Sequence, residues 1–263
     1  STQAKTLFPY TTLFRSPSMI WVEKCNRFDI TFDNIIDPDF AGSVTIGLDE
    51  FTDPITAGST TSGIWWELGD MNVNGKTIRT TTYPIYLVQP AGDNHVAAFW
   101  CNLQMATNAT SAATIYVSGE GSSSRWKSWM NVMEAGSPAA VAGYGLYASG
   151  SHYLQSQKVY GSANALQISL TASKTNCAFW CDILKLQTPG VGIKLNDTIP
   201  SDARFDMRVQ HILDGGGMAS GLNFNGAGSM RLAGTRFAIT NTTGVPVVKG
   251  GTGFLELSGC NLN

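Results

Sequence analysis

Four aromatic residues recur at one position of a repeated strand pattern, and they are the residues here best suited to bind a ligand. Trp65, Tyr86, Tyr116 and Tyr147 are each the second residue of a short apolar run. Because successive side chains of a strand point to opposite faces, these four point outward if their apolar neighbours point inward. Flat aromatic faces suit the C–H faces of sugars, and tyrosine adds a hydroxyl. We therefore predict an exposed ligand-binding strip, with a stacking ladder that only stabilises the sheet as the alternative.

Carboxylates accompany this strip. Glu67 begins the next outward position, and Asp70, Asp93 and Glu120 follow three consecutive runs in what we expect to be turns. Glycoside hydrolysis needs two carboxyl groups about 5–5.5 Å apart for retention or about 6.5–9.5 Å apart for inversion. Neighbouring coils of a stacked structure offer the first separation and next-but-one coils the second. Asp70, Asp93 and Glu120 are thus candidate catalytic residues, and Glu67 a ligand contact; the alternative is a cluster of solvated turn acids.

The elements that position these residues belong to a repeat. Apolar runs such as 85–88, 115–118 and 193–196 return with a period of about 24–30 residues, each followed by a polar step that often reads Cys-Asn. A fixed period of this size with strands inside it indicates a solenoid, in which stacked coils bury a continuous apolar interior. A coil of this length has room for three short strands. We predict about nine coils, with Ile85, Leu87, Ile115, Val117, Ile168, Leu170, Ile193 and Leu195 inside.

This pattern resembles the right-handed parallel β-helix, the pectate-lyase-like architecture shared by polysaccharide lyases, pectinases and bacteriophage tailspikes. The resemblance covers roughly residues 19–263 and rests on the repeat, not on a signature string. It implies an all-β fold, an extracellular or virion-surface location, a polysaccharide partner, and compatibility with a homotrimer. In lyases of this architecture a basic residue abstracts a proton from a uronate, so the resemblance draws attention to the basic residues of the chain.

The polar steps hold a second constellation. Lys158, Asp182, His211 and Arg236 occupy these steps in consecutive coils. They would form either a basic catalytic group or a ladder of alternating charges, and the ladder is the default. Four of the five cysteines also lie at polar steps several coils apart, too far for disulfides, so we expect free thiols. The aromatics of the second half of each coil, among them Trp129 and Trp180, are expected to fill the core, with a subunit interface as the alternative.

Composition excludes several classes of function. Charged residues make up 14% of the 263 residues against about 25% in a typical globular protein, and the net charge is −2 without a basic patch. Electrostatic binding of nucleic acid is therefore not expected. No apolar run is long enough to span a membrane. No zinc, phosphate-loop or EF-hand spacing is present, so no metal site or cofactor is predicted, although acids in an insertion loop at about 35–62 are the oxygen type that suits Ca²⁺.

The first residues stand apart from the repeat. Residues 6–16 read TLFPYTTLFRS, which resembles the translation of a DNA-sequencing adapter, so we treat residues 1–16 as non-native and residues 17–263 as one β-helix domain. We expect both ends of the solenoid to be incomplete. The leading functional hypothesis is binding of a cell-surface or extracellular polysaccharide by a tailspike-like β-helix, with depolymerase activity left open. The alternatives are a secreted polysaccharide lyase or glycoside hydrolase, and a structural shaft.

Deleting residues 1–16 should leave the free energy of unfolding within about half a kcal/mol of that of the full chain, because the segment is expected to make few native contacts. Urea denaturation of both forms measures this difference. A loss of more than about 2 kcal/mol would show that the segment is part of the fold.

Overall fold

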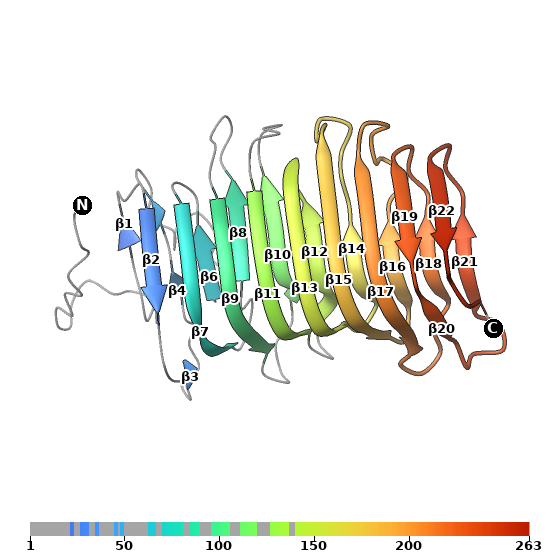
Figure 1. The fold of residues 1–263 in the computed structure, drawn as a ribbon, viewed down its shortest axis with the longest axis horizontal. Helices are drawn as coiled ribbons and strands as arrows, with labels where there is room; N and C mark the ends of the chain where they lie inside the picture. The colour runs from blue at the N-terminus through green and yellow to red at the C-terminus, as the bar shows by residue number, and fades with distance from the viewer. Residues whose placement is uncertain are drawn as a thin grey trace.

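Two parallel sheets run side by side along the molecule and form an all-β solenoid (Figure 1). The computed structural model describes residues 22–23, 27–31, 35–36, 45–46, 48–49, 63–66, 70–80, 85–89, 96–105, 111–119, 127–136 and 140–262. All regular elements in these ranges are strands. A parallel β-solenoid is therefore confirmed, and residues 140–262 make about five turns of it.

One sheet, which we call the short-strand sheet, has nine strands. In spatial order they are β4 (Thr45–Ile46), β6 (Gly63–Trp66), β8 (Ile85–Gln89), β10 (Ser111–Gly119), β12 (Ala140–Tyr147), β14 (Asn164–Ile168), β16 (Val191–Leu195), β18 (Ser220–Phe224) and β21 (Val245–Lys249). Neighbouring strands of this sheet are about one repeat apart in the sequence and pair in parallel, as stacked coils require.

The other sheet, the long-strand sheet, has eleven strands. Its main path is β2 (Arg27–Thr31), β7 (Asp70–Thr80), β9 (Val96–Met105), β11 (Lys127–Gly136), β13 (Gly150–Tyr160), β15 (Cys177–Thr188), β17 (Arg204–Asp214), β19 (Ser229–Ala233) and β22 (Phe254–Ser258). Beside this path, β3 (Ile35–Ile36) pairs with β7, and β20 (Arg236–Ala238) pairs with β17. A separate two-stranded sheet joins β1 (Val22–Glu23) to β5 (Leu48–Asp49).

Each turn contains two strands where three short strands were expected. The second and third expected strands form one long strand that bends at a corner. At this corner two successive residues are not buried, which interrupts the alternation of buried and exposed side chains. These pairs are 157–158 in β13, 184–185 in β15 and 210–211 in β17. In the next turn the corner separates β19 from β20 at Gly234, whose φ of +68° favours glycine.

The apolar interior is the one that alternation predicts. Six of the eight predicted core residues are completely buried, namely Ile115, Val117, Ile168, Leu170, Ile193 and Leu195. The other two, Ile85 and Leu87, pair in register with Ile115 and Val117, and their side chains lie outside the described set. The predicted inward face of these strands is therefore confirmed.

The register within the short-strand sheet differs from the expected one in two turns. The repeat pattern aligned Leu146 with Ile115 and Ile168 with Ile193, whereas the structure pairs Leu146 with Val117 and Ile168 with Leu195. Both differences are two residues. Because side chains alternate with a period of two, such a shift changes the partner of a residue but leaves it on the same face.

A buried histidine lies on the inward face of the long-strand sheet. His152 in β13 is fully buried; its Nδ1 lies 2.7 Å from Ser128 Oγ and its Nε2 lies 3.0 Å from the Ser149 carbonyl oxygen. Since a carbonyl only accepts, Nε2 carries the proton and Nδ1 accepts from the serine hydroxyl, which makes the imidazole neutral. Burial lowers the pKa of His152 from 6.5 to about 4, and the hydrogen bond to Ser149 opposes this shift.

Replacing Ile193 by Ala should lower the free energy of unfolding by about 2–5 kcal/mol, because the side chain is fully enclosed and its loss leaves a cavity. Chemical denaturation measures the change. A matched substitution of the exposed Val141 by Ala should cost far less, and similar costs at both positions would contradict the assigned core.

Stability should fall as the pH is lowered from about 6.5 to about 4, because His152 takes up a proton in the unfolded chain in this range but not in the folded one. The pKa difference corresponds to roughly 3 kcal/mol. Urea denaturation across this range, compared with the same series for His152→Gln, isolates the contribution. Equal pH slopes in both proteins would contradict it, whatever the absolute stability of the variant.

Candidate functional site

The four residues of the predicted aromatic strip belong to the short-strand sheet, and the two whose side chains are described, Tyr116 and Tyr147, lie on its outer face. Trp65 pairs with Tyr86, and Tyr86 pairs with Tyr116, so these three occupy one register position in consecutive turns. The next residue at that position is Gly145, because Tyr147 pairs instead with Ser118. The side chains of Trp65 and Tyr86 lie outside the described set.

Tyr147 reaches the strip despite its shifted register. Its ring stacks on that of Tyr116, with centroids 4.7 Å apart and an angle of 24° between the planes. Gly145 makes this contact feasible, because a Cβ at that position would lie 2.7 Å from a ring carbon of Tyr147. Both tyrosines are half-buried. Tyr116 and Tyr147 are therefore brought together as predicted, but each covers much of the other's face.

Only one of the four predicted carboxylate residues lies in a described strand. Asp70 is the first residue of β7 and pairs with Arg27. Glu67, Asp93 and Glu120 lie outside the described residues. The assignment of Asp70, Asp93 and Glu120 to catalysis, and of Glu67 to ligand contact, stays a prediction.

A second set of aromatics stands on the outer face of the long-strand sheet. Trp129, Tyr153 and Trp180 occupy one register position in three consecutive turns, and we call them the aromatic column. Trp129 is 48% exposed and Trp180 is 43% exposed, whereas Tyr153 between them is half-buried. The rings of Trp129 and Tyr153 are 4.5 Å apart between centroids.

The expectation that Trp129 and Trp180 fill the core is therefore wrong. The signal that could have placed them correctly was in the sequence. In β15, Cys177, Phe179 and Cys181 alternate toward the interior, which leaves Trp180 outside. Cys177 and Cys181 are free and buried, and the partly buried Cys260 is also free, as predicted for Cys181 and Cys260. Burial raises the pKa of the Cys177 thiol to about 12, so this thiol is protonated and unreactive.

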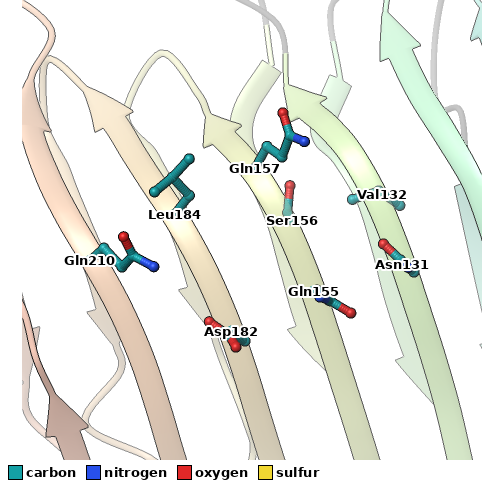
Figure 2. A pocket seen from close by; sticks show the side chains of 8 residues that line it. All are labelled: Asn131, Val132, Gln155, Ser156, Gln157, Asp182, Leu184 and Gln210. Atoms are coloured by element: carbon teal, nitrogen blue, oxygen red, sulfur yellow. The ribbon is translucent and has the colours of Figure 1, made fainter.

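A concavity of about 490 Å³ lies beside the aromatic column on the same sheet, and we call it the long-strand groove. Figure 2 shows its lining side chains on adjacent strands, with Gln155, Asp182 and Gln210 projecting from three of them. The lining residues are Asn131, Val132, Gln155, Ser156, Gln157, Asp182, Leu184 and Gln210. Amide groups, which donate and accept hydrogen bonds, thus predominate over charged groups.

The electrostatics of the groove centre on one carboxylate. Asp182 pairs in register with Gln155 and with Arg208, so an acid and a base face each other on neighbouring strands. Burial raises the pKa of the Tyr153 hydroxyl, the Asp182 carboxylate adds to this shift, and Arg208 opposes it. The phenol therefore remains a neutral donor and acceptor at physiological pH. Together these groups offer flat apolar faces and a row of hydrogen-bonding side chains.

The polar steps have a different composition from the expected one. At the corner of the long strands Lys158 pairs with Lys185, Lys185 with His211, and His211 with Arg236. Asp182 is three residues from this position and lies in the groove instead. We call Lys158, Lys185, His211 and Arg236 the cation column. The expected ladder of alternating charges is therefore wrong.

Neither a metal centre nor a membrane span is found in the part of the chain that the structure describes. No group of three or more His, Cys, Asp or Glu residues is arranged there to hold a metal ion. No helix among those residues has the length and hydropathy needed to cross a membrane. Comparison of the chain with protein-family models, with curated proteins and with solved structures gave no match.

Proposed function

We propose that this chain is a right-handed parallel β-helix of about nine coils, similar to the pectate-lyase-like architecture, that binds an extracellular or cell-surface polysaccharide. In this proposal it acts as a tailspike-like adhesin outside the cell or on a virion. The repeat and the two parallel sheets support the architecture. The single observation that supports the activity is the exposed aromatic column beside the long-strand groove.

The exposure of the aromatic column favours a role in ligand binding over a role in stabilising the sheet. An aromatic residue that only stabilised the sheet would bury its faces against its neighbours, as Tyr116 and Tyr147 do in part. Trp129 also contacts the ring of Tyr153, but Trp129 and Trp180 still leave almost half of their surface in contact with solvent. Exposed apolar groups that gather in adjacent turns mark a binding surface. The groove supplies the exposed amide side chains of Asn131, Gln155 and Gln210, which can donate hydrogen bonds to sugar hydroxyls and accept hydrogen bonds from them.

The long-strand face supports this function better than the strip that the sequence predicts. Its aromatics adjoin a concavity, and its polar lining is largely uncharged. The strip of Trp65, Tyr86, Tyr116 and Tyr147 remains a second surface for the same ligand class. A homotrimer is compatible with either surface.

Catalysis is the second candidate function, and one observation favours it. Asp182 is a carboxylate inside the groove, and Asp206 lies one strand away, in register with Trp180. Two carboxyl groups on one sugar-binding face are the minimum for glycoside hydrolysis. In a depolymerase these two aspartates would act where Asp70, Asp93 and Glu120 were predicted to act. A structural shaft is the third candidate, and it predicts no glycan binding at all.

A screen of the full chain on a glycan array, followed by titration with the best-bound glycan, tests the proposal. The double variant Trp129→Ala/Trp180→Ala should weaken binding by at least about tenfold, because each lost stacking contact contributes roughly 1 kcal/mol. Phe254→Ala removes an exposed aromatic of the same sheet outside the groove and should bind like wild type. Tyr116→Ala/Tyr147→Ala reports on the predicted strip.

Three outcomes would change the proposal. Absence of binding to every glycan would favour the shaft. Unchanged binding by the tryptophan variant, with loss in the tyrosine variant, would move the site to the short-strand sheet. Release of oligosaccharides that stops in Asp182→Asn would make the chain an enzyme.

A further inference from the structure

The turn that contains β21 and β22 exposes apolar surface that the preceding turns cover. Eight large hydrophobic residues are exposed among the side chains that the structure describes, and four of them belong to this turn, namely Val245, Val248, Phe254 and Leu262. Phe254 is the most exposed of the eight, at 65%. Exposed apolar residues that gather in this way mark an interaction surface, which here lies at one end of the solenoid.

The inward side chains of this turn are also incompletely covered. Leu222 and Leu232 are completely buried, whereas Val247 and Leu257, their partners in register one turn later, are only partly buried. Among the described residues, the partly buried hydrophobics that pack against the core all lie in this turn, namely Ile239, Val247, Leu255, Leu257 and Cys260. Another layer of strands would cover them, as each turn of a solenoid covers the one before it.

The edge of β21 is protected against the addition of a strand. The Val245 N–H donates to the Ala219 carbonyl of the preceding turn, with 3.1 Å between N and O, so the next residue, Pro246, faces the open edge. Proline has no N–H to offer there. Lys249 occupies the register position of the buried Phe224, and a charge at an inward position is a second device that blocks pairing.

The edge of β22 has neither of these devices. The Phe254 N–H donates to the Gly228 carbonyl of the preceding turn, with 3.0 Å between N and O. The direction of these groups alternates along a strand, so Leu255 and Leu257 present an N–H and a C=O each to the open edge. Such an edge is a template for pairing with another chain. Of the two strands in this turn, β22 is therefore the one suited to accept a further strand.

The opposite end of the solenoid has the matching asymmetry (Figure 1). The long-strand sheet starts with β2, a strand of five residues like β22, whereas the short-strand sheet starts with β4, a strand of two residues. Successive turns pair in parallel, so a second copy placed head to tail would align its β2 with β22 in the same direction. Its β4 would then lie beside the protected β21, where little pairing is on offer.

The charges at the two ends are complementary. Asp206, Arg231 and Glu256 share one register position, so the sign alternates toward this end, and Arg231 Nε lies 3.5 Å from Glu256 Oε1. Opposite charges that face each other on neighbouring strands stabilise a sheet, and like charges destabilise it. A cation should therefore follow Glu256. β2 supplies Arg27, which pairs in register with Asp70 of its own molecule, so the alternation would continue across the junction.

We propose that a second copy of this chain docks head to tail on this end, with its β2 beside β22 and its Arg27 opposite Glu256. The register within one molecule would instead place Asp29 opposite Glu256, so the junction is shifted by two residues. A shift of two leaves every residue on its own face. The contact is heterologous and does not close, so the copies form a filament. This inference does not depend on glycan binding.

Sedimentation of the full chain over a wide range of concentrations tests the inference. The average mass should rise with concentration and pass that of a dimer, because each added copy presents a new β22. Electron microscopy should show particles that lengthen at constant width. Monomers at every concentration would overturn the inference. A mass that stops at the dimer would also overturn it, since it would indicate pairing of two identical ends, and a stop at the trimer would indicate association side by side.

Charge reversal at the junction gives a second test. Arg27→Glu would face Glu256 of the next copy, and Glu256→Arg would face its Arg27. Either variant alone should therefore associate at least about tenfold more weakly than wild type. An equimolar mixture of the two should regain association, because every end then meets an opposite charge. Lys194→Glu reverses an exposed cation away from both ends and should associate like wild type.

The mixture separates docking from damage to the fold. Glu256→Arg also removes the ion pair with Arg231, and a last turn damaged in this way would not recover when Arg27→Glu is added. If the mixture stays as weakly associated as its components, the junction is wrong. If both single variants associate like wild type, Arg27 and Glu256 do not meet, and the head-to-tail contact fails as well.

Discussion

The pairing of each strand with its equivalents one turn before and one turn after is the constraint on which the rest of this structure depends. A strand of five residues cannot bury its apolar face alone, but stacking at about 4.8 Å encloses that face between turns. Once Ile193 and Leu195 are inside, Lys194 between them has to be outside. The outer surface is thus a set of columns whose composition follows from the register of the interior.

The sequence predicts which face a residue occupies better than it predicts which residue is its neighbour. A shift of two residues leaves the apolar face unchanged, so the repeat alone could not place Leu146 opposite Val117. The register depends on details such as Gly145, where the ring of Tyr147 occupies the space that a side chain would take. The prediction of an aromatic strip has the same limit, because it requires that the aromatic residues lie next to one another on adjacent strands.

The corner explains why the charged residues predicted for the polar steps were wrong. Two successive outward residues at each corner interrupt the alternation, and no residue type marks the interruption in every turn. The polar step at Gln210-His211 coincides with the corner, whereas in the preceding turn the corner falls at Leu184-Lys185 and not at Cys181-Asp182. A three-residue error moves an acid into the corner and a lysine out of it. It therefore puts Asp182 in the place of Lys185 and gives an apparent ladder of alternating charges.

Polar groups that serve the fold differ from those that are available to a ligand. Asp214 accepts hydrogen bonds from the backbone of Gly216 and Met218 in its own turn, at 2.7 and 2.9 Å, and from Thr240 and Asn241 in the next turn. Burial acts to raise the pKa of this carboxyl, but these hydrogen bonds outweigh it and hold the pKa well below its ordinary value. Asp214 is thus an acid whose oxygens are already occupied, and it ties two turns together.

His152 similarly uses both ring nitrogens inside the solenoid. The amides of the groove lie on the outward face of their strands instead. They lie on a surface whose register the interior fixes, so their composition is free to match a ligand. A solenoid separates these tasks, because the inward half of each strand determines stability and the outward half determines what the molecule contacts. The exposed Trp129 and Trp180 belong to that outward half, and their contact with solvent is the physical argument for a binding surface.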